Sequence, residues 1–169
     1  INIIAFSLWG DNPLYTHGAI INAMLTPYIY PEWQALFYVD KTVPTAILKK
    51  LEHYGAQIKM LEKPKQHYAR LLWRFLISDN EQVTRFICRD TDSRLNIQEK
   101  IAVDEWVNSG KAFHLMRDSL GQCELILAGM WGGVAGVLPK MADLLTVFEN
   151  TNHEKWLDQN FTRQLLWPL

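Results

Sequence analysis

The sequence has little cysteine and almost no excess charge, and each shortage excludes a class of protein. Only two cysteines, Cys88 and Cys123, occur among the 169 residues. Two thiols in apolar surroundings, without a closely spaced motif, predict buried free cysteines in a reducing compartment rather than a disulfide framework or a cysteine metal site. The formal net charge of −1 provides no electrostatic footprint for nucleic acid or for an acidic membrane surface.

Long apolar runs are also missing. No run approaches the roughly 18 residues of a transmembrane helix, so we expect no transmembrane segment and a cytoplasmic location. Hydrophobic residues make up 49% of the chain and charged residues 21%, a balance that predicts one ordinary globular domain over residues 1–169. The chain begins at Ile1 within an expected strand and ends abruptly at Leu169, which suggests truncation at the C-terminus.

Strand-like and helix-like segments alternate along the first half of the chain. The expected strands cover 2–8, 34–39, 57–61, 83–88, 113–116 and 125–128. The expected helices cover 18–25, 44–54, 68–77, 97–107, 140–148 and 152–166, with turns over 9–13 and 129–133. This alternation predicts an α/β fold with a mostly parallel central sheet and helices on both faces.

The segment richest in chemistry follows the expected strand 83–88. Asp90 and Asp92 lie where that strand ends, and residues two apart in an extended segment point to the same side. Open α/β sheets bind ligands at this carboxyl edge. Two close carboxylates repel each other unless a cation intervenes, and hard oxygen ligands favour Mg²⁺ or Mn²⁺ shared with substrate phosphates. The alternative interpretation is a solvated loop with a helix-capping Asp or Ser.

Polar residues also follow the other expected strands. Ser7 and Asp11 come after the first strand and Asp40 after the second. Because such strand ends converge on one crevice in a doubly wound sheet, this pattern indicates a nucleotide-type site. Arg70 and Arg74 share one helix face and have the chemistry to bracket a phosphate, although a solvated helix face is the preferred interpretation for Arg70.

Other residue types support a site less well. The glycine-rich segment 129–133 lacks the spacing of a phosphate-binding loop and is interpreted as a turn, with lining of the cleft left open. No histidine has the partner four residues away that a zinc helix needs, and no nucleophile elbow is present. Three arginines flank acidic residues and are expected in structural ion pairs: Arg89, Arg94 and Arg117, with Asp92, Glu99 and Asp118.

Several longer segments occur in order through nearly the whole chain: FSLWGDNPLYTHGAIINA, FYVDKTVP, LLWRFLISDN, RFICRDTDSRL, AVDEWVNSGKAFHLMRD and ILAGMWG. Together they resemble bacterial glycosyltransferase-like proteins of the GT-A type. The segment Asp158–Asn160 (DQN) is similar to the short D-Q motif found late in related retaining glycosyltransferases.

This resemblance implies a Rossmann-like GT-A fold that binds a nucleoside-diphosphate sugar. It implies Mn²⁺ or Mg²⁺ on Asp90 and Asp92, with the metal acting as a Lewis acid on the departing diphosphate. The other implied positions are Ser7, Leu8 and Trp9 beside the base and ribose, Arg74 and Asp90 at the phosphates or donor sugar, Asp118 and Trp131 facing the sugar or acceptor, and Asp158 near the reacting carbon. Asp118 and Asp158 are thus the implied catalytic residues.

The chain departs from the family pattern at two places. Relatives carry a His-Pro and a further His after the segment equivalent to 116–118, where this chain has 119–123 (SLGQC). Relatives also supply a late metal-binding His, whereas His153 precedes Asp158 here. The resulting hypothesis is a metal-dependent glycosyltransferase with an unknown acceptor. The alternatives are a non-catalytic nucleotide-sugar or glycan-binding module and a metal-dependent nucleotidyltransferase or phosphohydrolase.

Overall fold

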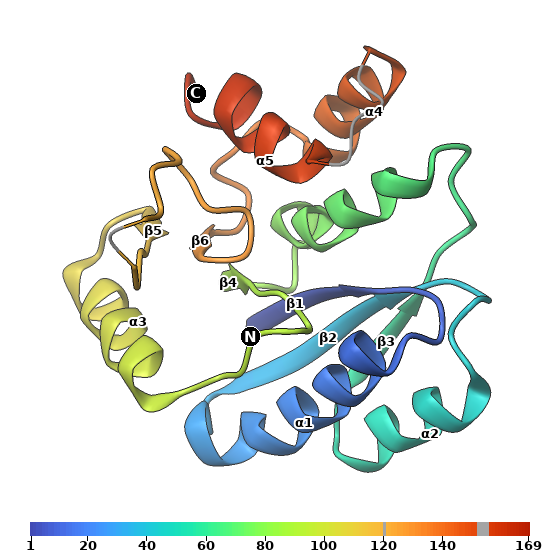
Figure 1. The fold of residues 1–169 in the computed structure, drawn as a ribbon. Coiled ribbons are helices and arrows are strands. Elements are labelled where there is room, and N and C mark those ends of the chain that lie inside the picture. The colour runs from blue at the N-terminus through green and yellow to red at the C-terminus, as the bar shows by residue number, and fades with distance from the viewer. Residues whose placement is uncertain (120, 152–155) are drawn as a thin grey trace.

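The computed structural model describes residues 1–119, 121–151 and 156–169, and places a six-stranded sheet between helices (Figure 1). The strands are β1 (Asn2–Leu8), β2 (Trp33–Val39), β3 (Gln57–Met60), β4 (Arg85–Cys88), β5 (Phe113–Leu115) and β6 (Trp131–Val134). The helices are α1 (Pro13–Ile29), α2 (Thr45–His53), the 3₁₀ helix η1 (His67–Asp79), α3 (Ile97–Ser109), α4 (Met141–Thr151), α5 (Leu157–Phe161) and the π-helical turn η2 (Thr162–Leu166).

The sheet has the strand order β3-β2-β1-β4-β6-β5. β1 pairs in parallel with β2 and β4, and β2 pairs in parallel with β3. β6 runs antiparallel to both β4 and β5. The prediction of an α/β fold with a mostly parallel sheet is therefore confirmed.

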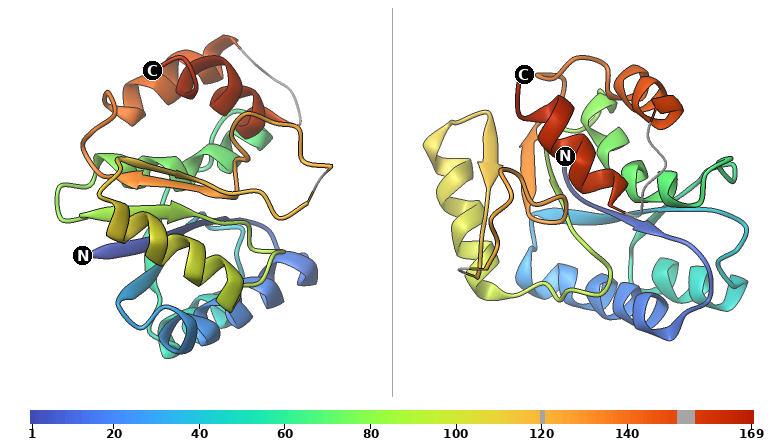
Figure 2. Two further views of the ribbon diagram at one scale, coloured as in Figure 1. Left: turned by 90° about the vertical axis from the view of Figure 1, so that its left-hand side faces the viewer. Right: turned by 45° about the horizontal axis from the view of Figure 1, so that its top comes forward.

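Helices cover both faces of this sheet because β1 is apolar on both sides. Ile4 and Phe6 pack in one buried cluster with residues of α1, α2 and α3. Ile3 and Ala5 point to the opposite face and pack with residues of η1, α4, α5 and η2. Two views of the ribbon show the helical layers on either side of the sheet (Figure 2). Burial of each large apolar side chain contributes roughly 1.5–3 kcal/mol, so both layers are held mainly by the hydrophobic effect.

Helix α1 begins five residues earlier than the sequence pattern predicts, at Pro13 rather than Gly18. Asn12 caps the helix, because its side-chain oxygen accepts a hydrogen bond from the backbone N–H of Leu14 at 3.0 Å. Proline suits the first helical position, where its missing N–H has no partner to lose. The Asn-Pro pair was the available signal, and it places the start of α1 directly after the turn that follows β1.

The expected strand over 125–128 is wrong, and strand β6 lies instead in the segment expected to be a turn. Backbone groups of 126–128 bond to a side chain rather than to a neighbouring strand. The Gln159 amide donates to the Ile126 carbonyl and accepts from the Ala128 N–H at 3.1 Å. Pairing with β4 and β5 makes the glycine-containing Trp131–Val134 a strand, because tertiary context overrides strand propensity.

The last expected helix, 152–166, is only partly testable, since 152–155 lie outside the described residues. The remainder divides into α5 and η2. Over the described ranges, none of the helices has the length and apolar character to span a membrane.

Candidate functional site

The strand order gives a topological switch point, with a crevice outside the carboxyl ends of the neighbouring strands β1 and β4. From β1 the chain builds β2 and β3 on one side, and then returns through η1 to β4 on the other side. Ligands bind to open α/β sheets outside the carboxyl ends of the strands at such a switch point. Ser7 and Leu8 end β1 at this point, and Asp90 lies two residues beyond β4.

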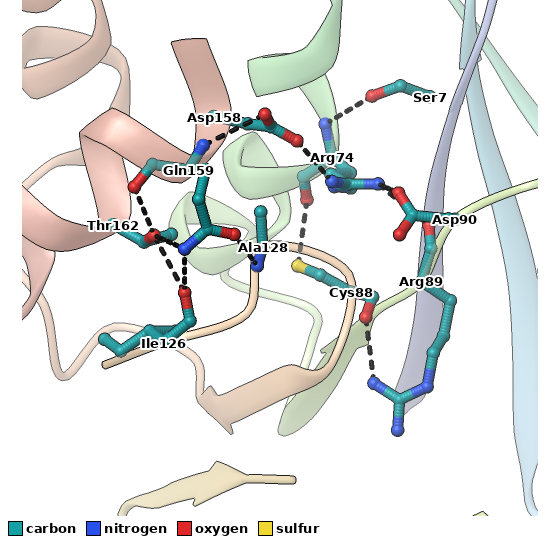
Figure 3. A network of polar contacts seen from close by, with 10 residues as sticks. All are labelled: Ser7, Arg74, Cys88, Arg89, Asp90, Ile126, Ala128, Asp158, Gln159 and Thr162. Carbon is teal, nitrogen blue, oxygen red and sulfur yellow. Dashed lines mark hydrogen bonds and ion pairs between the residues drawn. The ribbon is translucent and has the colours of Figure 1, made fainter. Parts of the chain in front are cut away.

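Arg74 of η1 lies at the centre of the crevice and is 2% exposed. Its backbone N–H donates to Ser7 Oγ at 3.0 Å. Its guanidinium Nη1 donates to the Asp90 carboxylate and to the Arg89 carbonyl, and Nη2 donates to Asp158 Oδ2 at 2.7 Å (Figure 3). One buried arginine therefore joins the ends of β1 and β4 to helix α5.

The charges around this arginine are unbalanced. Two carboxylates, Asp90 and Asp158, share one guanidinium, which leaves one negative charge when both are ionised. Burial raises the pKa of Asp158, and the Asp90 charge raises it further, against the lowering effect of Arg74. The two carboxylates hold the pKa of Arg74 above its usual value despite its burial. The cluster accordingly has the electrostatics to attract a further cation or proton.

Two pockets flank the arginine. The first, a narrow cleft of about 50 Å³, is lined by Ser7, Leu8, Trp9 and Arg74 together with side chains of α1, η1 and the 90–95 loop. The second has a volume of about 250 Å³, and we call it the acidic pocket because Asp90, Asp118 and Asp158 line it. The structure thus brings most of the sequence-predicted site residues together, in two adjoining groups bridged by Arg74.

Asp92 and Trp131 lie apart from these groups. Asp92 is exposed on the loop after β4 and lines neither of the two pockets. Trp131 is 1% exposed, and its ring packs edge-on against Phe75 and Phe86 in the core. Trp131 lines a separate apolar pocket together with Leu115.

The glycine-rich segment 129–133 does line the site, because Gly129 forms part of the wall of the acidic pocket. Any side chain at this position would overlap the Asp90 carboxylate. The backbone therefore approaches Asp90 closely only because residue 129 is glycine. In the described ranges there is no cluster of three or more His, Cys, Asp or Glu side chains able to hold a metal ion.

Two residues of α1 that sequence reasoning missed hold the loop between β4 and α3. The Asn22 side chain is fully buried, accepts from the Leu95 N–H at 3.1 Å and donates to the Ser93 carbonyl at 2.9 Å. Gly18 lies so close to the Thr91 carbonyl that a side chain there would overlap it. An asparagine in a helix interior was the available signal, since such residues are unfavourable there unless the side chain has a partner.

Arg70 is not on a solvated helix face as preferred from the sequence. It is 2% exposed, and its Nε donates to Asp40 Oδ2 at 2.8 Å. Hydrogen bonds from Thr42 and Arg70 lower the pKa of Asp40 in spite of its burial. Asp40 is therefore used in a structural ion pair beside the crevice.

The expected ion pair of Arg89 is confirmed, with Nε 2.9 Å from Glu99 Oε2. Glu99 stands in the first turn of α3, so this buried pair ties β4 to that helix. Arg94 and Arg117 donate to backbone carbonyls instead of forming the expected acidic pairs.

A scan of protein-family models and a search of curated proteins returned no match to this chain.

Proposed function

We propose that this protein is a metal-dependent glycosyltransferase on a GT-A-like nucleotide-sugar-binding domain. It would move a sugar from a nucleoside-diphosphate donor to an acceptor. The observation that carries the proposal is the position of Arg74 between Asp90 and Asp158 at the switch point of the sheet. A buried guanidinium beside two carboxylates and an open pocket suits a ligand that combines a diphosphate with a cation.

The donor would extend across both pockets. Ser7, Leu8 and Trp9 line the cleft on one side of Arg74 and would contact the base and ribose. The diphosphate would lie at Arg74, because guanidinium groups pair well with phosphate oxygens. The sugar would then reach the acidic pocket, which Asp118 and Asp158 line. There Asp158 would lie near the reacting carbon, and the exposed Asp118 would face the sugar or the acceptor.

In this proposal Asp90 and Asp92 would hold a metal that is shared with the donor diphosphate, which would supply further oxygen ligands. The Asp90 side chain is 43% exposed, and one of its oxygens bonds to Arg74. Asp92, exposed on the same loop, is the second proposed ligand. Mg²⁺ and Mn²⁺ are commonly held by one or two protein carboxylates plus substrate phosphates. When bound, the metal would stabilise the negative charge of the leaving diphosphate.

Thermal unfolding with a panel of nucleoside diphosphates and nucleotide sugars, with and without Mn²⁺, tests donor binding. A ligand at about 100 times its Kd adds roughly 2.7 kcal/mol of stability. For a domain of this size each kcal/mol raises Tm by about 2–4 °C. We expect a Mn²⁺-dependent shift for one base. The absence of a shift with every nucleotide would overturn the proposal.

Two variants assign the metal site. Asp90→Asn should remove the Mn²⁺-dependent part of the shift, and Asp92→Asn tests the second ligand. Asp104→Asn is the matched control, since this partly exposed carboxylate pairs with Lys100 on α3 away from the crevice.

The products released from a nucleotide sugar distinguish the possible reactions. Release of nucleoside diphosphate would support transfer of the sugar. Release of pyrophosphate would favour a nucleotidyltransferase, and binding without turnover would favour a binding module.

A further inference from the structure

The acidic pocket continues into a larger groove on the same side of the molecule. This second hollow has a volume of about 690 Å³ and is lined in part by Cys123, Glu124 and Arg163. It shares four lining residues with the acidic pocket: Gln122, Leu127, Trp156 and Gln159. The shared walls make one continuous path, which we call the lateral groove, from Asp158 outwards to the Glu124–Arg163 pair.

Trp156 stands where the two hollows join and is 66% exposed. A large aromatic side chain left this exposed in a concave polar site is a typical contact for an amphipathic ligand. The ring of a sugar is such a ligand, because its C–H groups form an apolar face while its hydroxyls point outwards. The position of the indole therefore favours a carbohydrate over a purely apolar or purely charged ligand.

The side chains of the polar wall are held by hydrogen bonds, and the charges at its outer end are paired. Arg163 Nε donates to Glu124 Oε2 at 3.0 Å, so the two charges offset each other. The Gln159 amide is held by backbone groups of 126 and 128. Gln122 exchanges hydrogen bonds with Asp118, accepting from its N–H at 3.0 Å. The outer end of the groove therefore has no surplus charge, while its inner end carries the carboxylates of Asp118 and Asp158. Such a lining suits a neutral hydroxyl-rich chain better than a polyanion.

We propose that the lateral groove binds a neutral oligosaccharide, with one sugar ring on Trp156 and the chain end directed towards Asp158. The identification of this ligand as the acceptor rests on the proposed function. Binding of the oligosaccharide itself does not require donor or metal.

The first experiment measures binding of maltohexaose, cellohexaose, chitohexaose and mannohexaose by calorimetry, with heparin and an acidic peptide for comparison. We expect one neutral hexasaccharide to bind, Trp156→Ala to weaken its binding at least tenfold, and Trp156→Phe to retain most of it. Trp167→Ala is the matched control, because Trp167 is also exposed but lines the separate apolar pocket. No binding of any neutral hexasaccharide, or tighter binding of heparin or the peptide, would overturn the proposal.

A second experiment blocks the groove without a substitution. Cys123 lines the groove and is exposed, whereas Cys88 is buried, so a bulky maleimide should modify Cys123 selectively. The adduct should abolish oligosaccharide binding and leave the nucleotide-dependent thermal shift unchanged; the Cys123→Ala variant, treated in the same way, should keep both. Undiminished oligosaccharide binding by the adduct would contradict the proposal that the lateral groove is the binding site. If the unmodified protein binds an oligosaccharide but no nucleotide raises its Tm, the proposed oligosaccharide site would stand and the glycosyltransferase proposal would be refuted.

Discussion

Arg74 Nη2 donates to Asp158 Oδ2 across 2.7 Å and thereby joins two residues that are 84 positions apart. The side chains are 3% and 11% exposed. Buried charges are stable only when they are paired and hydrogen-bonded, so each side chain depends on the other. The pair fixes α5 against η1 and closes one wall of the acidic pocket.

Removal of Arg74 should destabilise the fold strongly. Arg74→Met leaves the buried Asp158 carboxylate without its cation, and loss of one partner of a buried pair costs about 3–5 kcal/mol. Asp158→Asn in the same protein should recover part of this loss, because the uncompensated charge is then gone. Urea unfolding of the two single variants and the double variant measures the coupling. Additive effects would show that the pair has no energetic link.

His114 should make stability depend on pH. It lies in β5 at 7% exposure with its ring stacked on Trp106, and burial followed by the Arg89 charge lowers its pKa to about 4. In the unfolded chain the imidazole of His114 takes up a proton near pH 6.5, whereas in the folded protein it stays neutral until the pH approaches 4. The contribution of His114 to folding stability is therefore fully present above pH 6.5 and is lost as the pH falls towards 4. The loss amounts to roughly 3 kcal/mol at the most. Urea unfolding between pH 7 and pH 4 measures it.

His114→Gln should flatten this pH dependence. The matched control is His53→Gln, since His53 is exposed at the end of α2 and its replacement should keep the wild-type slope. An unchanged slope in His114→Gln would assign the pH dependence to other groups.

Asn22 should control the order of the loop that carries Asp90 and Asp92. Asn22→Ala removes the acceptor of the buried Leu95 N–H, and an unsatisfied buried group costs about 1–3 kcal/mol. Hydrogen exchange should rise in a peptide covering 91–96 and stay slow in β2, which α1 also contacts. Nucleotide affinity should fall along with the loop protection. Equal acceleration in both peptides would indicate global rather than local loosening.

The two thiols should react very differently. The prediction of free cysteines is confirmed, but the prediction that both are buried is wrong for Cys123, which is exposed. Burial raises the pKa of Cys88 to about 12, so little nucleophilic thiolate forms there. Intact mass after maleimide treatment should show one adduct in the native protein and two after denaturation. Two adducts in the native protein would contradict the burial of Cys88.

Cys88→Ala should behave as a small truncation in the core. Cys88 is fully buried at the end of β4, so loss of its sulfur should cost about 1–2 kcal/mol. Nucleotide binding should remain. Loss of the nucleotide shift in a folded Cys88→Ala protein would contradict a purely packing role.

Strand and helix assignments succeeded where local pattern and packing agree. The apolar run of β1 was predicted with its observed bounds, because its side chains are buried on both faces of the sheet. Residues 125–128 have an equally apolar pattern, but Gln159 occupies their backbone groups and prevents pairing. The strand in this part of the chain is decided by contacts with β4 and β5 instead.

The sequence by itself determined the α/β alternation and the position of Asp90 just beyond a buried strand, because side-chain periodicity and turn residues act over a few neighbouring positions. Only the tertiary structure decided which polar residues meet. Arg74 reaches Asp158 because the C-terminal helices pack on the same face of the sheet as η1. The same packing buries Trp131 in the core and leaves Trp156 exposed beside the acidic pocket. Such contacts depend on how distant apolar faces are buried together, and local spacing does not encode them.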